Sequence, residues 1–252
     1  MTVTVAGEPF IGYLLAAIRI VAWLVIVPPF SMRAVPVTAK TLLALGLAFA
    51  IAPGLAESSA PIGAAGLIVS ALQEAVLGAA LGFVTYLVLA AVQAAGDLID
   101  VFGGFSLAAA FDPMSLNMNS VYGKLYQMLA LMLLFASDAH LIVVGGLLKT
   151  FERMPVGAVW HLDNATHVVT VAFGVFFVAA VQIALPLVGV LFIADLGLAL
   201  LTKVAPQLNA IGIMFPAKIG LTLLVVGLSF PVLPEAIQRL VETANEAMAA
   251  LR

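Results

Sequence analysis

The length of the apolar segments constrains this chain more than any other feature of its sequence. One segment covers residues 62–96, about 35 residues, which would form a helix roughly 50 Å long. Another covers residues 165–204 and contains Pro186. A membrane-spanning helix needs only about 20 residues. These segments therefore predict helices that are longer than a membrane is thick.

Charged residues are too few to solvate a globule of this size. Of the 252 residues, 64% are hydrophobic and 9% are charged, whereas about a quarter are charged in a soluble domain. We therefore predict an integral-membrane, all-α protein whose apolar surface faces lipid or other apolar subunits. The net charge of −3 indicates no nucleic acid or other polyionic partner. The absence of cysteine excludes disulfides, zinc–thiolate sites and cysteine nucleophiles.

The other apolar segments do not fit a conventional bundle of spans. They cover residues 10–30, 41–52, 124–148 and 209–233, and we expect residues 235–252 to form an amphipathic helix. The second of them has about a dozen residues, too few to cross a bilayer. The first is too long for the apolar region of a signal peptide and no basic residue precedes it, so we expect it to be retained.

The basic residues do not decide the orientation in the membrane. If every segment spans, four basic residues lie on each side. The two sets are Arg33, Lys40, Lys124 and Lys203 against Lys149, Arg153, Arg239 and Arg252. Two explanations stay open: the segments are miscounted, or some of them are paired helical hairpins held inside an assembly.

Polar side chains interrupt the apolar segments at several positions. They are Arg19, Gln73, Glu74, Gln93, Asp138, His140, Gln182, Asp195 and Lys218. Ionisable groups are costly in lipid and normally face protein or water. Each can pair with a neighbouring helix and set its position, contact another subunit, or take part in an ion or proton relay. Their spacing does not group them into one site.

Small residues form a stripe in the segment 62–96. Gly78 and Gly82 are four residues apart and therefore share one face of a helix. Small side chains allow two helix backbones to approach closely. The stripe predicts a tight helix contact at these two glycines.

The stretch 97–122 is apolar yet rich in residues that break helices. Its distinctive residues are Gly103, Gly104, Phe105, Phe111, Asp112, Pro113, Met114 and Met118. Irregular backbone at membrane depth is tolerated only inside protein or beside a water-filled cavity. The stretch is either an ordinary external loop or a constriction, in which flexible glycines let phenylalanine and methionine side chains close a pore and move aside.

The motifs of enzymes are missing from the sequence. No two of His140, His161 and His167 are four residues apart, as a metal-binding histidine pair on a helix requires. There is no phosphate-binding glycine–lysine loop and no Gly-x-Ser-x-Gly turn. We predict that the chain is not an enzyme and holds no metal and no cofactor.

A set of polar, glycine and proline residues recurs in a characteristic order along nearly the whole chain. In the first half it comprises Arg19, Pro29, Arg33, Val35, Pro36, Lys40, Gln73, Glu74, Gly78, Gly82, Phe83, Gln93, Ala95, Gly96, Asp97, Asp112 and Pro113. In the second half it comprises Ala184, Leu185, Pro186, Asp195, Leu196, Lys203, Pro206, Gln207, Asn209, Phe215, Pro216 and Lys218. In this order and spacing the chain resembles the FliR/SctT family, the export-gate subunit of flagella and type III secretion systems. It departs from the family at Asp138–Leu141, where Asn-Gly-His-Leu is usual, and at Gln182, where a basic residue is common.

The resemblance implies an architecture and partners that spacing alone does not. One copy of the chain would close a helical assembly of FliP-type and FliQ-type subunits, with an FlhB-type protein associated. The subunits of that family are helical hairpins in a conical assembly. This would account for the overlong segments and for the equal numbers of basic residues on the two sides of the membrane. The location implied is the bacterial inner membrane at the flagellar basal body, a flagellar system being favoured over an injectisome.

The resemblance also assigns regions and residues of the chain. Residues 1–252 would be one domain, in which residues 1–96 form an N-terminal helical region, residues 97–122 a plug-like loop, residues 123–234 helical hairpins and residues 235–252 a tail. The residues 103–118 would form the plug of an export channel for unfolded proteins. The polar residues expected to serve assembly are Arg19, Glu74, Asp195, Lys203, Gln207 and Lys218.

One rival function stays open beside the passive conduit. An ion-coupled secondary transporter of a small solute would use Asp195 or Glu74 for coupling. It predicts helix breaks at matching positions of two repeats. Pro186 is such a break, but the first half of the sequence has no counterpart.

Overall fold

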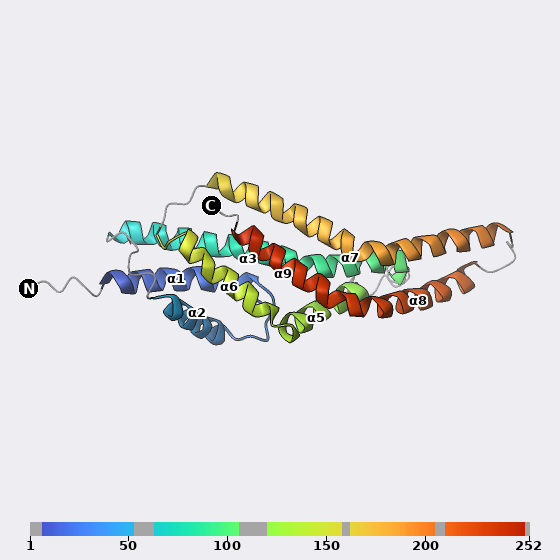
Figure 1. Ribbon diagram of the computed structural model, residues 1–252, viewed down its shortest axis with the longest axis horizontal. Helices are drawn as coiled ribbons and strands as arrows, with labels where there is room; N and C mark the ends of the chain where they lie inside the picture. The colour runs from blue at the N-terminus through green and yellow to red at the C-terminus, as the bar shows by residue number, and fades with distance from the viewer. Residues whose placement is uncertain (1–6, 53–62, 106–119, 158–161, 205–209, 250–252) are drawn as a thin grey trace, which may run out of the picture. The chain divides into compact units, whose positions relative to one another are not determined.

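A computed structural model describes residues 7–52, 63–105, 120–157, 162–204 and 210–249 of the chain. These described residues form helices and turns and contain no strand. The helices are α1 (Gly7–Ile26), α2 (Val37–Ile51), α3 (Ala64–Gly103), α5 (Val121–Ala136), α6 (Ala139–Arg153), α7 (Leu162–Val204), α8 (Ala210–Ser229), the 3₁₀ turn η2 (Phe230–Val232) and α9 (Leu233–Ala249) (Figure 1).

Three of the described helical stretches are long and apolar enough to cross a membrane. They are Ala64–Gly103, Val169–Val204 and Met214–Met248, and the bent pair α5–α6 would add a fourth if it counts as one span. Phe10–Ile26 and Val37–Ile51 are apolar but shorter. The prediction of an all-α integral-membrane protein is confirmed.

The two overlong segments are continuous helices. α3 has 40 residues and α7 has 43, each roughly 60 Å of helix, about twice the thickness of a hydrocarbon core. Pro186 lies inside α7 without ending it. α3 continues beyond residue 96 to Gly103, so the stretch without helix begins later than residue 97, where the sequence pattern places it.

The apolar segment 124–148 is not one helix, which corrects the sequence interpretation. α5 and α6 are two separate helices, with Ser137 and Asp138 between them. Asp138 has the left-handed φ of 55°, a conformation that ends a right-handed helix and that Asp tolerates better than most residues. The hydroxyl of Ser137 donates to the Leu133 carbonyl at 2.7 Å and satisfies an acceptor at the end of α5.

Proline residues mark the boundaries of two helices. α2 begins at Val37, earlier than residue 41 where the sequence pattern starts it, because Pro36 is extended at φ −64° and ψ 150° and opens the helix. At the other end of the chain, Pro231 lies in the 3₁₀ turn that separates α8 from α9. The predicted amphipathic tail helix is α9, in which Glu235 and Arg239 are exposed while residues such as Val241 are buried.

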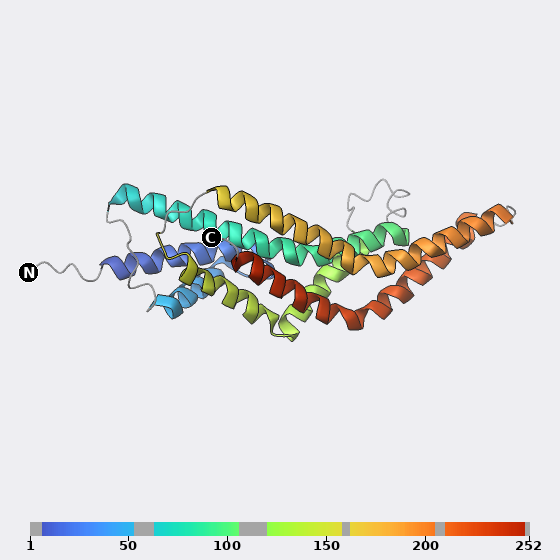
Figure 2. The same cartoon turned by 45° about the horizontal axis from the view of Figure 1, so that its top comes forward.

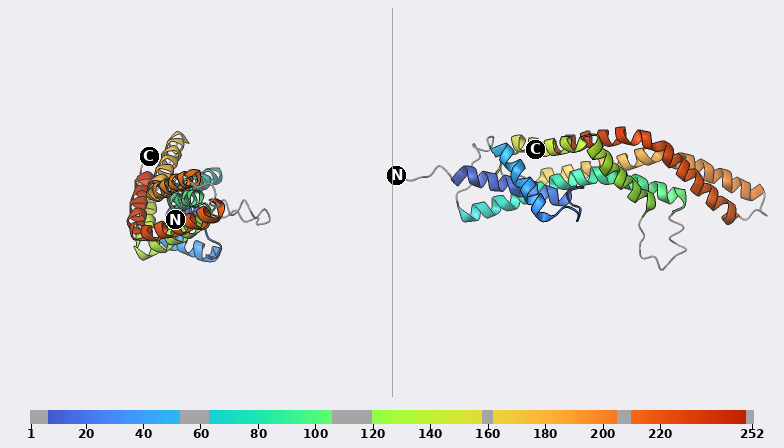
Figure 3. Two further views of the ribbon diagram at one scale, coloured as in Figure 1. Left: turned by 90° about the vertical axis from the view of Figure 1, so that its right-hand side faces the viewer. Right: turned by 90° about the horizontal axis from the view of Figure 1, so that it is seen from below.

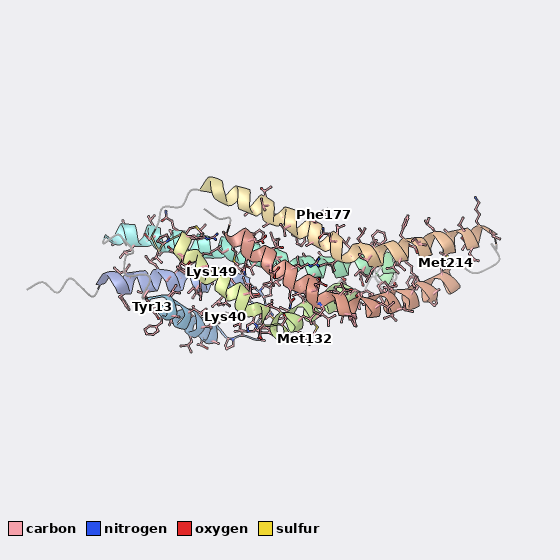
Figure 4. The ribbon with its side chains drawn as sticks, viewed as in Figure 1. Tyr13, Lys40, Met132, Lys149, Phe177 and Met214 are labelled. Atoms are coloured by element: carbon pink, nitrogen blue, oxygen red, sulfur yellow. The ribbon has the colours of Figure 1, made fainter. Side chains whose placement is uncertain are left out.

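The chain forms two compact units. Unit 1 consists of Met1–Val88, Asp138–Phe173 and Val241–Arg252, and unit 2 of Leu89–Ser137 and Gly174–Leu240. In unit 1, α1 packs on α2 and on the first half of α3, and Tyr13 of α1 donates from its hydroxyl to the Leu45 carbonyl at 3.2 Å (Figures 2 and 4). In unit 2, α7 and α8 lie side by side and are joined by an ion pair (Figure 3).

Candidate functional site

The most enclosed polar cluster lies in unit 1, where α1 and α3 pack together. The side chain of Arg19 on α1 is 1% exposed, and that of Glu74 on α3 is 4% exposed. Arg19 Nε donates to Glu74 Oε2 at 2.5 Å and Arg19 Nη2 donates to Oε1 at 3.0 Å. This bidentate geometry is the strong form of an arginine–carboxylate pair.

The turn after α6 completes this cluster. Arg19 Nη1 donates to the Met154 carbonyl at 3.0 Å, and the guanidinium lies 4.1 Å from the centre of the Phe151 ring. The amide of Gly157 donates to Glu74 Oε1 at 3.0 Å, and the φ of +80° at Gly157 is a conformation that favours glycine. Buried charges are tolerated when such partners satisfy them. The cluster therefore ties α1, α3 and the end of α6 together.

The two glycines of the small-residue stripe face α1. A Cβ added to Gly78 would overlap the Arg19 carbonyl, and a Cβ added to Gly82 would lie 3.2 Å from the Trp23 carbonyl oxygen. The structure thus places Gly78 and Gly82 at the closest approach between α1 and α3, next to the Arg19–Glu74 pair.

In unit 2, two of the polar residues that are expected to serve assembly form an ion pair. Lys218 on α8 donates from Nζ to Asp195 Oδ2 on α7 at 2.8 Å, and the side chains are 18% and 35% exposed. Lys203 is exposed in the last turn of α7, beyond Asp195 on the same helix. Gln207 lies outside the described residues.

The beginning of the expected plug lies at the end of α3. Gly103 is the last residue of α3, and Gly104 follows with a φ of +83°. The ring of Phe105 contacts that of Tyr122 edge-to-face, with centres 4.9 Å apart. The other expected plug residues lie outside the described residues, namely Phe111, Asp112, Pro113, Met114 and Met118.

Sequence reasoning missed Asp100, a buried carboxylate in the last turn of α3. It is 5% exposed and accepts a hydrogen bond from the Tyr122 amide at 3.3 Å. The sequence pattern starts a loop at residue 97 and therefore does not place Asp100 in a buried helix. The spacing of four between the buried residues Ala95 and Ile99 is the signal that could have extended the helix.

A second missed contact joins α6 and α9 in unit 1. Asn245 Nδ2 donates to the Ile142 carbonyl at 3.0 Å. A Cβ added to Gly146 would overlap the Asn245 side chain, so a glycine in α6 makes room for it. The pair Gly145–Gly146 inside an apolar helix is the signal that could have indicated a close neighbour.

These clusters can fix helices, but they do not form a metal centre. No three His, Asp or Glu side chains of the described residues lie together as a metal site. The ion pairs Arg19–Glu74 and Lys218–Asp195 each join two helices, and their charges are used on partners within the chain.

Comparison with known proteins identifies relatives over most of the chain. The family model described as bacterial export proteins, family 1, matches residues 10–244. The flagellar biosynthetic protein FliR of Escherichia coli is 36% identical over 198 residues, covering 78% of this chain and 76% of the relative. FliR of Bacillus subtilis is 30% identical over 203 residues, covering 79% and 78%.

A relative from a different export system also matches. The Yop proteins translocation protein T of Yersinia pestis is 26% identical over 206 residues, covering 80% of this chain and 79% of the relative. Together with the flagellar relatives, this match confirms the resemblance predicted from the ordered motifs.

Proposed function

This chain belongs to the bacterial export proteins, family 1, and we propose that it is a pore-forming subunit of the flagellar or type III export gate. As a membrane protein of this family it functions in protein export. In the proposed role it lines and closes the channel through which unfolded proteins pass. Its place is the bacterial inner membrane at the flagellar basal body, and it catalyses no reaction.

The observation that carries the proposal is the apolar surface of helices that are longer than a bilayer is thick. α7 and α8 expose large hydrophobic side chains along their length. They include Phe177, which is labelled in Figure 4, and also Val178, Leu185, Phe192, Ile193, Leu196, Leu200, Leu223, Leu224 and Leu228. Apolar surface of this extent marks interaction with other proteins or with lipid. A helix of roughly 60 Å exceeds what lipid can cover, so other subunits cover the rest.

The partners of the proposed assembly are other apolar helical subunits. We assign them as FliP-type and FliQ-type subunits, with an FlhB-type protein associated. Buried ion pairs such as Arg19–Glu74 fix the helices of this chain before its exposed faces meet those partners. Asp195 and Lys218 do the same for α7 and α8.

The closing element of the proposed gate is the stretch 103–118. Gly104, with its positive φ, directly follows the last residue of α3. Phe105, Phe111, Met114 and Met118 supply apolar bulk, and Pro113 biases Asp112 away from helix. Hydrophobic bulk in a narrow pore closes it to water and ions.

Deleting residues 106–110 in the assembled gate tests this function. We expect the complex to assemble and the membrane to leak ions or small solutes, because bulk has been removed from the closure. A deletion of equal length at residues 56–60, between α2 and α3, is the control and should not leak. Normal assembly with a tight membrane after deletion of residues 106–110 would show that the closure lies in another subunit.

The rival function, an ion-coupled transporter, finds no supporting contact at Glu74. That carboxylate accepts three hydrogen bonds, two from Arg19 and one from Gly157. A carboxylate enclosed in this way suits a structural pair, whereas a coupling site has to exchange its ion with water. Asp195, at 35% side-chain exposure, is the residue on which the two functions can be separated by experiment.

A further inference from the structure

Three helices of unit 2 meet where α3 ends, and we call their contact residues the neck: Asp100, Gly103, Phe105, Tyr122 and Thr222. Hydrogen bonds hold the first turn of α5 there. Its Tyr122 amide donates to Asp100 at 3.3 Å, and its Gly123 amide donates to Ser120 Oγ at 2.8 Å. A helix N-terminus leaves four amides without an intrahelical partner and favours a negative charge. Asp100 therefore attaches the start of α5 to α3.

The backbones of α3 and α5 approach each other closely here, with no room for a side chain at two positions. A Cβ added to Gly96 would overlap the Tyr122 carbonyl, and a Cβ added to Gly123 would overlap the Asp97 carboxylate. Glycine at both positions permits this approach. A sliding movement of α5 along α3 would bring larger side chains into these two positions.

The end of α3 is also held against α8. A Cβ added to Gly103 would lie 2.9 Å from Thr222 Cγ2 and 3.5 Å from Thr222 Cβ, and Thr222 is 0% exposed. A Cβ added to Gly104 would lie 3.5 Å from Lys218 Cδ, so the aliphatic stem of Lys218 covers this turn. Lys218 is itself held by Asp195.

We infer that the neck keeps its contacts while a substrate passes, and that α3, α5 and α8 do not separate there. Separation would break the hydrogen bond from the Tyr122 amide to Asp100 and would uncover side chains that are now buried, and both changes cost free energy. It would also break the ring contact of Phe105 with Tyr122. In this view Asp100 is a positioning residue for the gate. The inference rests on the proposed function.

Locking the neck with a disulfide tests the inference directly. The chain has no cysteine, so the pair Gly103→Cys and Thr222→Cys introduces its only two thiols. The separation of 3.5 Å between the Cβ positions lies within the range of disulfides. The assembled export gate carrying the pair is oxidised in cells, and secretion is compared with the reduced state and with each single variant.

We expect the disulfide to form in the resting gate, and we expect secretion by the oxidised pair to equal secretion by the same pair after reduction. A loss of secretion on oxidation that reduction reverses would overturn the inference, because the helices would then have to separate. Failure of the disulfide to form in an assembled gate would also overturn it, because the contact would be absent.

Variants of Asp100 provide a second test that does not depend on the cysteine pair. Asp100→Asn keeps an acceptor for the Tyr122 amide and should leave the resting membrane tight. Asp100→Ala removes the acceptor and should raise the leak of gates that still assemble, since the neck then positions the closure poorly. A tight membrane and normal secretion with Asp100→Ala would overturn the inference.

The deletion of residues 106–110 separates failure of the inference from failure of the proposed function. If that deletion does not leak, the proposed closing role fails, whatever the disulfide does. If the deletion leaks but the oxidised neck stops secretion, the closing role stands and the fixed neck is wrong.

Discussion

The guanidinium of Arg19 lies 2.5 Å from the Glu74 carboxylate, at a point where neither side chain reaches the surface of the chain. The two residues are 55 positions apart in the sequence and belong to different helices. Removing one partner of such a pair leaves the other as an uncompensated buried charge. Replacing both residues by apolar residues of similar volume often leaves the stability nearly unchanged.

We predict that Glu74→Leu alone destabilises the chain by about 3–5 kcal/mol, because Arg19 remains charged and buried. The double variant Arg19→Met/Glu74→Leu should recover most of that loss. The temperature at which the purified export complex loses this subunit measures both. An exposed pair, Arg239 with Glu235, supplies the control, and Arg239→Ala should change nothing measurable. Equal losses in the single and double variants would contradict the prediction.

We predict that Gly78→Ala weakens the contact of α3 with α1 by about 1–3 kcal/mol, as overpacking of a tight site does. The added methyl group would meet the Arg19 backbone, which cannot rotate away. Gly46→Ala in α2 is the matched control, since nothing lies within 4 Å of a Cβ there. That control should be neutral or slightly stabilising, because Ala favours helix more than Gly. The amount of assembled complex in membranes reports both effects.

We predict that Asp195 serves assembly and not proton coupling. Asp195→Asn keeps an oxygen that accepts from Lys218, so most of the complex and most of the secretion should persist. Asp195→Leu leaves the Lys218 ammonium without its acceptor and should reduce the assembled complex, while Asp195→Leu/Lys218→Met should restore some of it. Complex is counted by native gel and secretion by exported substrate. If Asp195→Asn assembles fully but exports nothing, a coupling role explains the residue better.

We predict that the chain expressed without its partner subunits aggregates or is degraded in detergent. Its exposed apolar side chains on α7 and α8 then have only detergent to cover them. Co-expression with FliP-type and FliQ-type subunits should yield a stable complex. Size-exclusion chromatography and proteolysis of both preparations make the comparison. A single symmetric peak of monomer that resists heating would count against an obligate assembly.

The sequence predicts those features of the fold that depend on composition along one helix. The overlong helices follow from apolar runs without a break, and the contact at Gly78 and Gly82 follows from small residues four apart. The bend between α5 and α6 does not follow, because Asp138 adopts its left-handed conformation without any Gly or Pro to signal it. Long helices alone therefore identify the class of protein but not its hairpins.

The candidate site is predictable only as a list of residues and not as a set of contacts. The sequence singles out Arg19, Glu74, Asp195 and Lys218, since charges in apolar runs are rare. It does not pair them, because the partners lie on different helices and far apart along the chain. It misses Asp100, whose role depends on the start of α5 being brought against the end of α3.

The length of α7 has a consequence for the amount of this protein in a cell. A bilayer covers about 30 Å of it, and in the proposed assembly protein covers the remainder of this 43-residue helix, which exposes large apolar side chains such as Phe177 and Leu200. Binding to partners then adds to the free energy of folding by mass action, so the stability of this chain depends on partner concentration. Copies made in excess of their partners stay open to proteases. The steady-state level of this subunit should therefore follow the supply of its scarcest partner and not its own rate of synthesis.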